Sequence, residues 1–258
     1  MFDWNLFFLL ALISIPGVLI AARGNLGILE RLIASQNTDQ KLPPKNLLLL
    51  VSAAQTLLLV AIAAALGTAL AGRVGLAAPV FQAISAEDPG WPRLLEQLPW
   101  GIGMGLVAAL VFLVAYYRFF RPRLDTETVR VTEALRAALG LSGRLFYGAI
   151  VEEILVRWGL MSLFVWLLSF IFSPLTPLAY WIAIILSGLL FALGHIPGSL
   201  AAGAKKTPMF YAATLFLNGW ASLIFGWLFW QHGLMAAMLA HALLHLLWHP
   251  LEQRSRAA

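Results

Sequence analysis

Residues 145–172 read LFYGAIVEEILVRWGLMSLFVWLLSFIF, a long apolar run with three charged side chains, Glu152, Glu153 and Arg157. An α-helix rises about 1.5 Å per residue, so the run is long enough to cross the roughly 30 Å hydrocarbon layer of a membrane. A central acid or arginine costs roughly 2.5–3.5 kcal/mol in such a helix. The three charges therefore indicate a functional position within a predicted transmembrane helix.

Six other apolar runs accompany this one, at about 4–22, 47–72, 99–120, 178–198, 208–230 and 233–250. The chain has 258 residues, of which 61% are hydrophobic and 11% charged, whereas a soluble domain has about 25% charged residues. This composition excludes an ordinary cytosolic enzyme. We predict an all-α, polytopic transmembrane helix bundle with about seven spans, the first of them retained as a helix and not cleaved as a signal peptide.

The positive charges between the predicted spans alternate from one linker to the next. Linkers one, three and five, together with the tail, hold fourteen Lys and Arg residues, and the other linkers hold two, Arg73 and Arg93. Cytoplasmic loops carry the excess of Lys and Arg, so we expect the N-terminus outside and the C-terminus in the cytoplasm of a multi-pass protein, most simply of a bacterial inner membrane. The net charge of +5 then reports orientation, and no nucleic-acid partner is expected.

A helix is predicted between spans three and four, after Asp125-Thr126-Glu127. Asp125 is a good capping residue, an acid follows in the first turn, and Gly140 is a natural stop. Its mixed apolar and basic residues fit an amphipathic helix on the cytoplasmic membrane surface and fit a solvated connecting helix equally well. Elsewhere, Gly101 and Gly105 suggest close helix packing, and Trp248 is typical of an interfacial residue at a span end.

Helical geometry separates the two glutamates of residues 145–172. Each residue turns the helix by about 100°, so Glu153 and Arg157, four apart, share a face and can neutralise each other. Glu152 lies roughly 140° from Arg157 and is the carboxylate free to face another helix. The alternative is that all three charges form a buried network that holds the bundle together.

Three histidines complete the ionisable groups inside the spans. His241 and His245 are four apart and share a helix face, a spacing that can place two imidazoles on one metal ion or one substrate group. A haem site, a proton relay and a hydrogen-bonded core are alternatives. With the topology above, Glu152, His195 and the His241–His245 pair all lie in the cytoplasmic half of the membrane, which favours one catalytic or metal site. The chain has no cysteine, so metal ligands must be His and carboxylate groups.

Three motifs in this order resemble the CAAX-protease and bacteriocin-processing family of intramembrane proteases, relatives of the prenyl-protein endopeptidases. The first is Glu-Glu-x-x-x-Arg at 152–157, and the second is Phe-x-x-x-His, at Phe191 and His195. The third is His-x-x-x-Asn, where this chain has His241 but carries His245 in place of the usual Asn. The resemblance covers about residues 145–250.

The resemblance implies roles for these residues. Glu152 would be the general base that activates a water held between it and His195. Glu153 would be a supporting carboxylate oriented by Arg157. His241 and His245 would stabilise the oxyanion on the scissile carbonyl. Zinc is the metal that the family suggests, with Glu152, His195, His241 and His245 as candidate ligands, and a mechanism without metal uses the same residues.

We therefore predict an intramembrane endopeptidase that acts near the cytoplasmic membrane face on membrane-inserted or lipidated, for example prenylated, peptides. A proteolytically silent scaffold or immunity protein and a proton-coupled transporter are the alternatives. The predicted organisation is a membrane region of three spans at 1–124, a cytoplasmic amphipathic helix at 125–144, a catalytic four-helix core at 145–250 and a cytoplasmic tail at 251–258.

Overall fold

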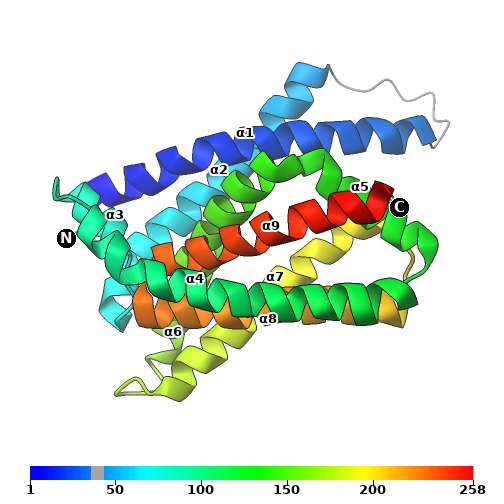
Figure 1. Ribbon diagram of the computed structural model, residues 1–258. Helices are drawn as coiled ribbons and strands as arrows, with labels where there is room; N and C mark the ends of the chain where they lie inside the picture. Colours follow the sequence, from blue (N-terminus) through cyan, green and yellow to red (C-terminus); the bar gives the residue numbers. More distant parts are fainter. Residues whose placement is uncertain (36–43, 258) are drawn as a thin grey trace.

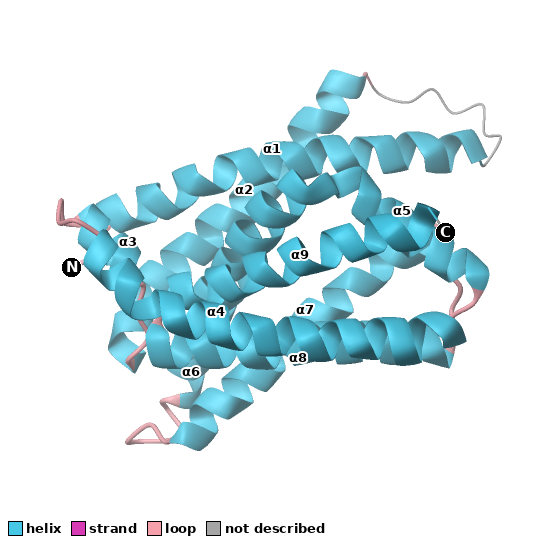
Figure 2. Ribbon diagram, viewed as in Figure 1, coloured by secondary structure: helices cyan, strands magenta, loops and turns pink. Residues whose placement is uncertain are grey.

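The computed structural model describes residues 1–35 and 44–257, and these form helices joined by short loops and turns, with no strand among them (Figures 1 and 2). The prediction of an all-α fold is confirmed. Of the residues in the charge count, Lys41 lies outside the described residues, as do the side chains of Arg31 and Arg256.

Six helices among the described residues are long and apolar enough to cross a membrane. They are α1 (Trp4–Ser35), α2 (Lys45–Leu70), α4 (Trp91–Val114), α7 (Pro177–Ala201), α8 (Pro208–His232) and α9 (Leu234–Ala257). Helix α2 is prolonged by η1 (Ala71–Val74), and α4 by η2 (Ala115–Phe120) and η3 (Arg121–Arg123). A short helix, α3 (Pro79–Ser85), precedes α4.

The charged run at 145–172 forms a seventh pass made of consecutive helical pieces. These are η4 (Arg144–Glu152), η5 (Ile154–Met161) and α6 (Ser162–Leu168), and the first two are π-helical. The two chain ends lie at opposite ends of the bundle (Figure 1). The six apolar helices alone would bring the C-terminus back to the end of the bundle where the N-terminus lies. The charged segment therefore also runs the length of the bundle, as predicted. Which end faces the cytoplasm stays a prediction.

The charged segment lies in the middle of the bundle. Helices α1 and α2 pack on one side of it, α7 and α8 on another, and α9 between it and α4. Long apolar side chains such as Leu58, Leu110 and Ile185 are exposed on the outer surface, as expected for a protein surrounded by lipid. The chain is thus an integral, multi-pass membrane protein.

Small residues bring the helices together, as they do in membrane bundles in general. A Cβ atom at Gly101 or Gly105 would lie 2.8 Å from Leu239 Cβ or 2.9 Å from Ala240 Cα, both in α9. The suggested close packing at these two glycines is therefore present. A Cβ at Gly159 of η5 would lie 2.7 Å from Ala63 Cα of α2.

Helix α5 (Thr126–Gly143) begins where the sequence predicted. The Asp125 carboxylate accepts a hydrogen bond of 3.0 Å from the Thr128 backbone N–H, which is the bond expected of a capping residue. At Gly140 the backbone φ is +66°, a conformation that glycine adopts readily. The chain bends there and runs on into η4, so Gly140 marks the change of direction between α5 and the charged segment.

Three helix ends differ clearly from the predicted span limits, and the first is the start of α4 at Trp91, eight residues before the expected 99. Helix α1 continues to Ser35, beyond the expected end at 22, and α9 continues to Ala257, beyond 250. The extension of α9 is explained by Glu252, which is fully buried among arginines. Trp248, predicted to be interfacial, is only 6% exposed, because it packs inside this same end of the bundle.

Candidate active site

A cavity of about 940 Å³ lies in the half of the bundle that contains α5 and the C-terminus. Its walls come from the C-terminal parts of α1, α4, α7 and α9, the N-terminal parts of α2 and α8, and from η2, α5, η4 and η5. Most of its lining is apolar. Its ionisable lining residues are Arg136, Arg144, Glu152, His195, His241 and His245, with the phenols Tyr116 and Tyr147. The four predicted catalytic side chains therefore line one cavity.

Glu153 and Arg157 form the ion pair that their spacing predicted. Arg157 Nε donates to Glu153 Oε2 at 3.1 Å, and both side chains are at most 2% exposed. The Arg157 Nη2 group also donates to Ser222 Oγ of α8 at 3.1 Å. The pair thus joins the charged segment to α8, outside the cavity lining.

His241 is held by the second oxygen of the same carboxylate. Its Nδ1 lies 2.8 Å from Glu153 Oε1, and because an ionised carboxylate only accepts hydrogen bonds, this nitrogen carries the proton. The His241 ring also stacks on Phe225 at 4.8 Å between centroids. Arg157, Glu153 and His241 therefore form a chain of contacts that fixes the ring and leaves Nε2 for the cavity.

Glu152 is the carboxylate that faces the cavity. Its side chain is 18% exposed, whereas that of Glu153 is 2% exposed. The Glu152 Oε2 atom lies 4.0 Å from His241 Nε2. One glutamate is thus paired and the other is presented to a neighbouring helix, although the segment is π-helical and its rotation differs from that of an α-helix.

His245 lies directly against the charged segment at Gly148. A Cβ at Gly148 would be 2.9 Å from His245 Nε2 and 3.6 Å from His241 Nε2, so glycine leaves the room that both rings occupy. The rings of His241 and His245 are 4.8 Å apart between centroids. The His245 Nδ1 atom is buried without a hydrogen-bond partner among the described residues. Gly148 was not recognised from the sequence, because only the packing reveals its proximity to the histidines.

His195 reaches the cavity from α7. Its Nδ1 lies 2.8 Å from the carbonyl oxygen of Phe191, and the two rings meet edge to face at 4.6 Å. Since a carbonyl oxygen accepts, Nδ1 carries the proton and Nε2 has a free lone pair. Phe191 therefore orients His195 through its backbone as well as its ring.

The side chains as they stand do not make a metal site. No group of three or more His, Asp or Glu residues among those the structure describes is arranged to hold a metal ion. The Nδ1 atoms of His195 and His241 are both engaged, as described above. A zinc site needs about four ligand atoms, each about 2.0–2.2 Å from the ion. We therefore derive no chemical step through a metal.

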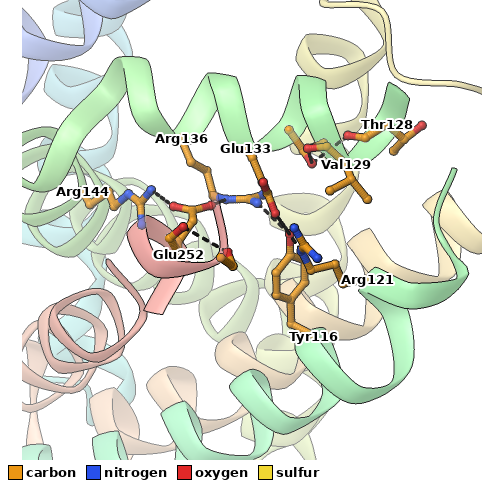
Figure 3. Close-up of polar contacts among 10 residues, drawn as sticks. Tyr116, Arg121, Thr128, Val129, Glu133, Arg136, Arg144 and Glu252 are labelled. Carbon is orange, nitrogen blue, oxygen red and sulfur yellow. Dashed lines mark hydrogen bonds and ion pairs between the residues drawn. The ribbon is translucent and has the colours of Figure 1, made fainter. Parts of the chain in front are cut away.

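A second polar cluster adjoins the cavity and was missed in the sequence, where its arginines were counted only as topology signals. Arg136 of α5 donates to Glu252 of α9 at 2.5 Å, and Arg144 also pairs with Glu252 (Figure 3). Arg121 pairs with Glu133 at 2.9 Å. The sequence does not indicate that charged residues of a linker are buried. The contacts of Arg136 and Arg144 with Glu252 join residues more than a hundred positions apart, so they depend on the fold.

The fold and the site together define a multi-pass helical membrane protein with a cavity between its helices that is lined by carboxylate and histidine side chains. Residues 133–247 match the family model described as type II CAAX prenyl endopeptidase Rce1-like. This match confirms the resemblance to the CAAX protease family, over a region that contains every predicted site residue. No curated protein and no solved structure matches the chain.

Proposed function

We propose that the protein is an intramembrane endopeptidase in which Glu152 activates the water that cleaves the peptide bond. The proposal rests on the different surroundings of the two adjacent glutamates. Glu153 is fixed by Arg157 and His241, whereas Glu152 faces a cavity that also contains His195 and His245. A purely structural charge network would pair both carboxylates.

In the proposed reaction, the Glu152 carboxylate takes a proton from water as the water oxygen bonds to the scissile carbonyl carbon. The carbonyl π electrons move to its oxygen and form a tetrahedral oxyanion. When the C–N bond breaks, the proton passes from Glu152 to the leaving amine. One water is consumed, and a carboxylic acid and an amine are formed.

The histidines support the charges of this reaction. The free lone pair of His195 Nε2 is suited to accept a hydrogen bond from the attacking water. His245 has an unpartnered Nδ1, and an imidazole N–H is a suitable donor to an oxyanion. His241 Nε2 faces Glu152 at 4.0 Å, and protonated there it would add a second donor.

The proposed substrates are peptides that reach the cavity from the membrane, including lipidated protein ends. The cavity lining combines this polar centre with apolar side chains from α2, α7 and α8, so it fits an apolar peptide. A bacterial inner membrane, with the cavity toward the cytoplasm, is the proposed location, on the basis of the charge distribution in the linkers.

The first test is mass spectrometry of peptides incubated with the purified protein in lipid vesicles. Plain and prenylated peptides are compared, with wild type and Glu152→Gln, each with and without a chelator. We expect cleavage by the wild type and none by the variant. Loss of activity on chelation would establish a metal, with zinc the first candidate. Undiminished cleavage by Glu152→Gln would overturn the assigned base.

A further inference from the structure

Two side-chain amides that line the cavity belong to membrane-spanning helices. Gln55 is ten residues beyond the start of α2, and Asn218 is ten residues beyond the start of α8. Ten residues of α-helix correspond to about 15 Å, half of the roughly 30 Å hydrocarbon layer. Gln55 is exposed and Asn218 is half-buried. An amide at such a place, in a mostly apolar cavity, is costly unless it finds hydrogen-bond partners.

A third amide, Gln97 of α4, has a structural role in this fold and serves as a comparison. Its side chain belongs to a residue that is 3% exposed and does not line the cavity. Its Nε2 donates to the Arg93 carbonyl oxygen at 3.2 Å, and its Oε1 accepts from the Ala236 backbone N–H of α9 at 3.1 Å. Both ends of this amide are bonded, and they join two helices, as polar side chains often do in membrane bundles.

Gln55 and Asn218 differ from Gln97, because neither amide is bonded to another helix among the described residues. Asn218 Nδ2 donates to the Thr214 carbonyl oxygen of its own helix at 2.8 Å, which leaves Oδ1 and the second N–H of this amide for a ligand. Gln55 offers a complete amide, with two N–H donors and an acceptor oxygen. Each amide therefore presents a donor and an acceptor, which are the two kinds of group that a peptide main chain pairs with.

The two amides lie on different sides of the segment that carries Glu152. Helix α2 packs on one side of this segment and α8 on another, and all three line the same cavity. A peptide in an apolar cavity is destabilised if its main-chain N–H and C=O groups have no partners. An extended peptide presents these groups along both of its edges. A partner on each side of Glu152 therefore suits a peptide that passes between α2 and α8.

We propose that Gln55 and Asn218 hydrogen-bond the main chain of an extended peptide on either side of the bond that is placed at Glu152. This inference rests on the proposed function. The two amides hold the substrate and take no part in the proton transfers. Because they bind main-chain groups, the site accepts peptides with different apolar side chains. It selects extended segments over helices, whose main-chain groups are already paired.

Equilibrium binding to Glu152→Gln protein tests this without relying on turnover. A fluorescent, mostly apolar peptide is titrated against the protein in lipid nanodiscs, and each main-chain amide of the peptide is replaced in turn by an ester. The ester lacks the N–H group at that position and leaves the side chains unchanged. We expect an ester at one or two positions to weaken binding about two- to tenfold, the ratio that one hydrogen bond provides. Equal binding of the parent peptide and of every ester would overturn the proposal.

Two protein variants assign these hydrogen bonds. Gln55→Met and Asn218→Leu, each added to Glu152→Gln, replace an amide by an apolar group of similar size. Each should weaken binding of the parent peptide about two- to tenfold and abolish the loss caused by its own ester, because the partner is already absent. Asn46→Leu is the matched control, since Asn46 is exposed in the first turn of α2 and does not line the cavity, and it should keep every ester effect.

Ester effects that persist in full in both variants would overturn the proposal, because the hydrogen bonds would then have other partners. Gln55 is exposed, so Gln55→Met leaves the packing intact. Ester effects that are unchanged in this variant at every position would therefore overturn the role of Gln55, even if Asn218→Leu does not fold.

The two proposals fail in different ways. If the ester effects are found and are lost in the variants, but the wild type cleaves no peptide, the main-chain site stands and the protease proposal falls. If the wild type cleaves peptides, and Gln55→Met and Asn218→Leu on the wild-type background do so with the same KM and kcat, the protease proposal stands and the main-chain site falls.

Discussion

The ion pair of Glu153 and Arg157 is the residue-scale feature on which the site depends most. Both side chains are at most 2% exposed, and removing one partner of such a pair leaves a buried, uncompensated charge. We expect Arg157→Met to lower the free energy of unfolding by about 3–5 kcal/mol. Thermal unfolding in detergent measures the loss.

Two controls separate this effect from a general loss of charge. Combining Arg157→Met with Glu153→Gln should recover most of the stability, because neither charge is then left alone. Arg93→Ala breaks an exposed pair with Glu96, whose side chains are 56% and 61% exposed, and should cost less than about 1 kcal/mol. A single Arg157→Met variant as stable as the wild type would contradict the pairing.

Gly148 carries a second residue-scale prediction. A methyl group there would lie 2.9 Å from His245 Nε2, so the Gly148→Ala change must move the His245 ring, and the His241 ring next to it. Displacing catalytic groups by about 1 Å costs on the order of a hundredfold in rate, so we expect kcat to fall by about ten- to a hundredfold. Gly103→Ala in α4, with open space around it, should leave kcat unchanged. Equal rates for the two variants would contradict the packing described at Gly148.

At this scale the sequence predicted the different orientations of Glu152 and Glu153, because adjacent residues of any helix point in different directions, even though the segment is π-helical and turns by less than the expected 100° per residue. It did not predict Arg144 or Gly148. Arg144 lies at a helix start, where positive charge is normally solvated. It is buried because it pairs with Glu252, which lies near the other end of the chain. Gly148 has a role only through the rings that approach it.

At the scale of the helix, Asp125 controls how α5 begins. Its carboxylate accepts from the Thr128 backbone and hydroxyl, and Lys205 of the α7–α8 loop lies 3.5 Å from it. We expect Asp125→Ala to speed hydrogen exchange of the first-turn amides of α5. Asp125→Asn can still cap the helix, so these amides should exchange as slowly as in the wild type. Exchange unchanged in Asp125→Ala would contradict the role of the cap.

The same cap has a defined pH dependence. The Thr128 hydroxyl that donates to it, more than the nearby Lys205 charge, holds the pKa of Asp125 below its ordinary 3.8. Since the folded pKa is the lower one, the stabilisation is complete above about pH 4 and is lost as the pH falls through the folded pKa. Protection of the first turn of α5 should therefore fall below pH 4 in the wild type and stay constant in Asp125→Asn. A loss of protection that begins near neutral pH would contradict this assignment.

The helices themselves were predictable where local chemistry sets their limits, as at the Asp125 cap and the bend at Gly140. Their ends were not predictable where long-range contacts prolong them. Helix α9 continues beyond its apolar residues because Glu252 forms ion pairs with two arginines, Arg136 and Arg144. The transmembrane pattern indicates where apolar residues stop, and a helix can continue beyond that point.

At the scale of the whole molecule, the seven passes place the loops on alternate sides of the membrane. The chain has no cysteine, so single cysteines can be labelled on the native background. We expect Lys206→Cys to react only from the cytoplasmic side, and Asp88→Cys and Ser173→Cys only from outside. All three positions are exposed. Labelling of Asp88→Cys and Ser173→Cys from opposite sides would contradict the seventh pass.

In the proposed mechanism Glu152 performs chemistry and does not hold the fold together. The most direct measurement compares peptide binding and single-turnover cleavage by wild type and Glu152→Gln in the same vesicles, with exposed Glu96→Gln as the control. We expect unchanged binding and unfolding temperature for Glu152→Gln, with cleavage reduced by at least about 10²–10⁴-fold, the contribution of a general base. Cleavage by Glu152→Gln at the wild-type rate, or loss of its fold, would contradict the claim.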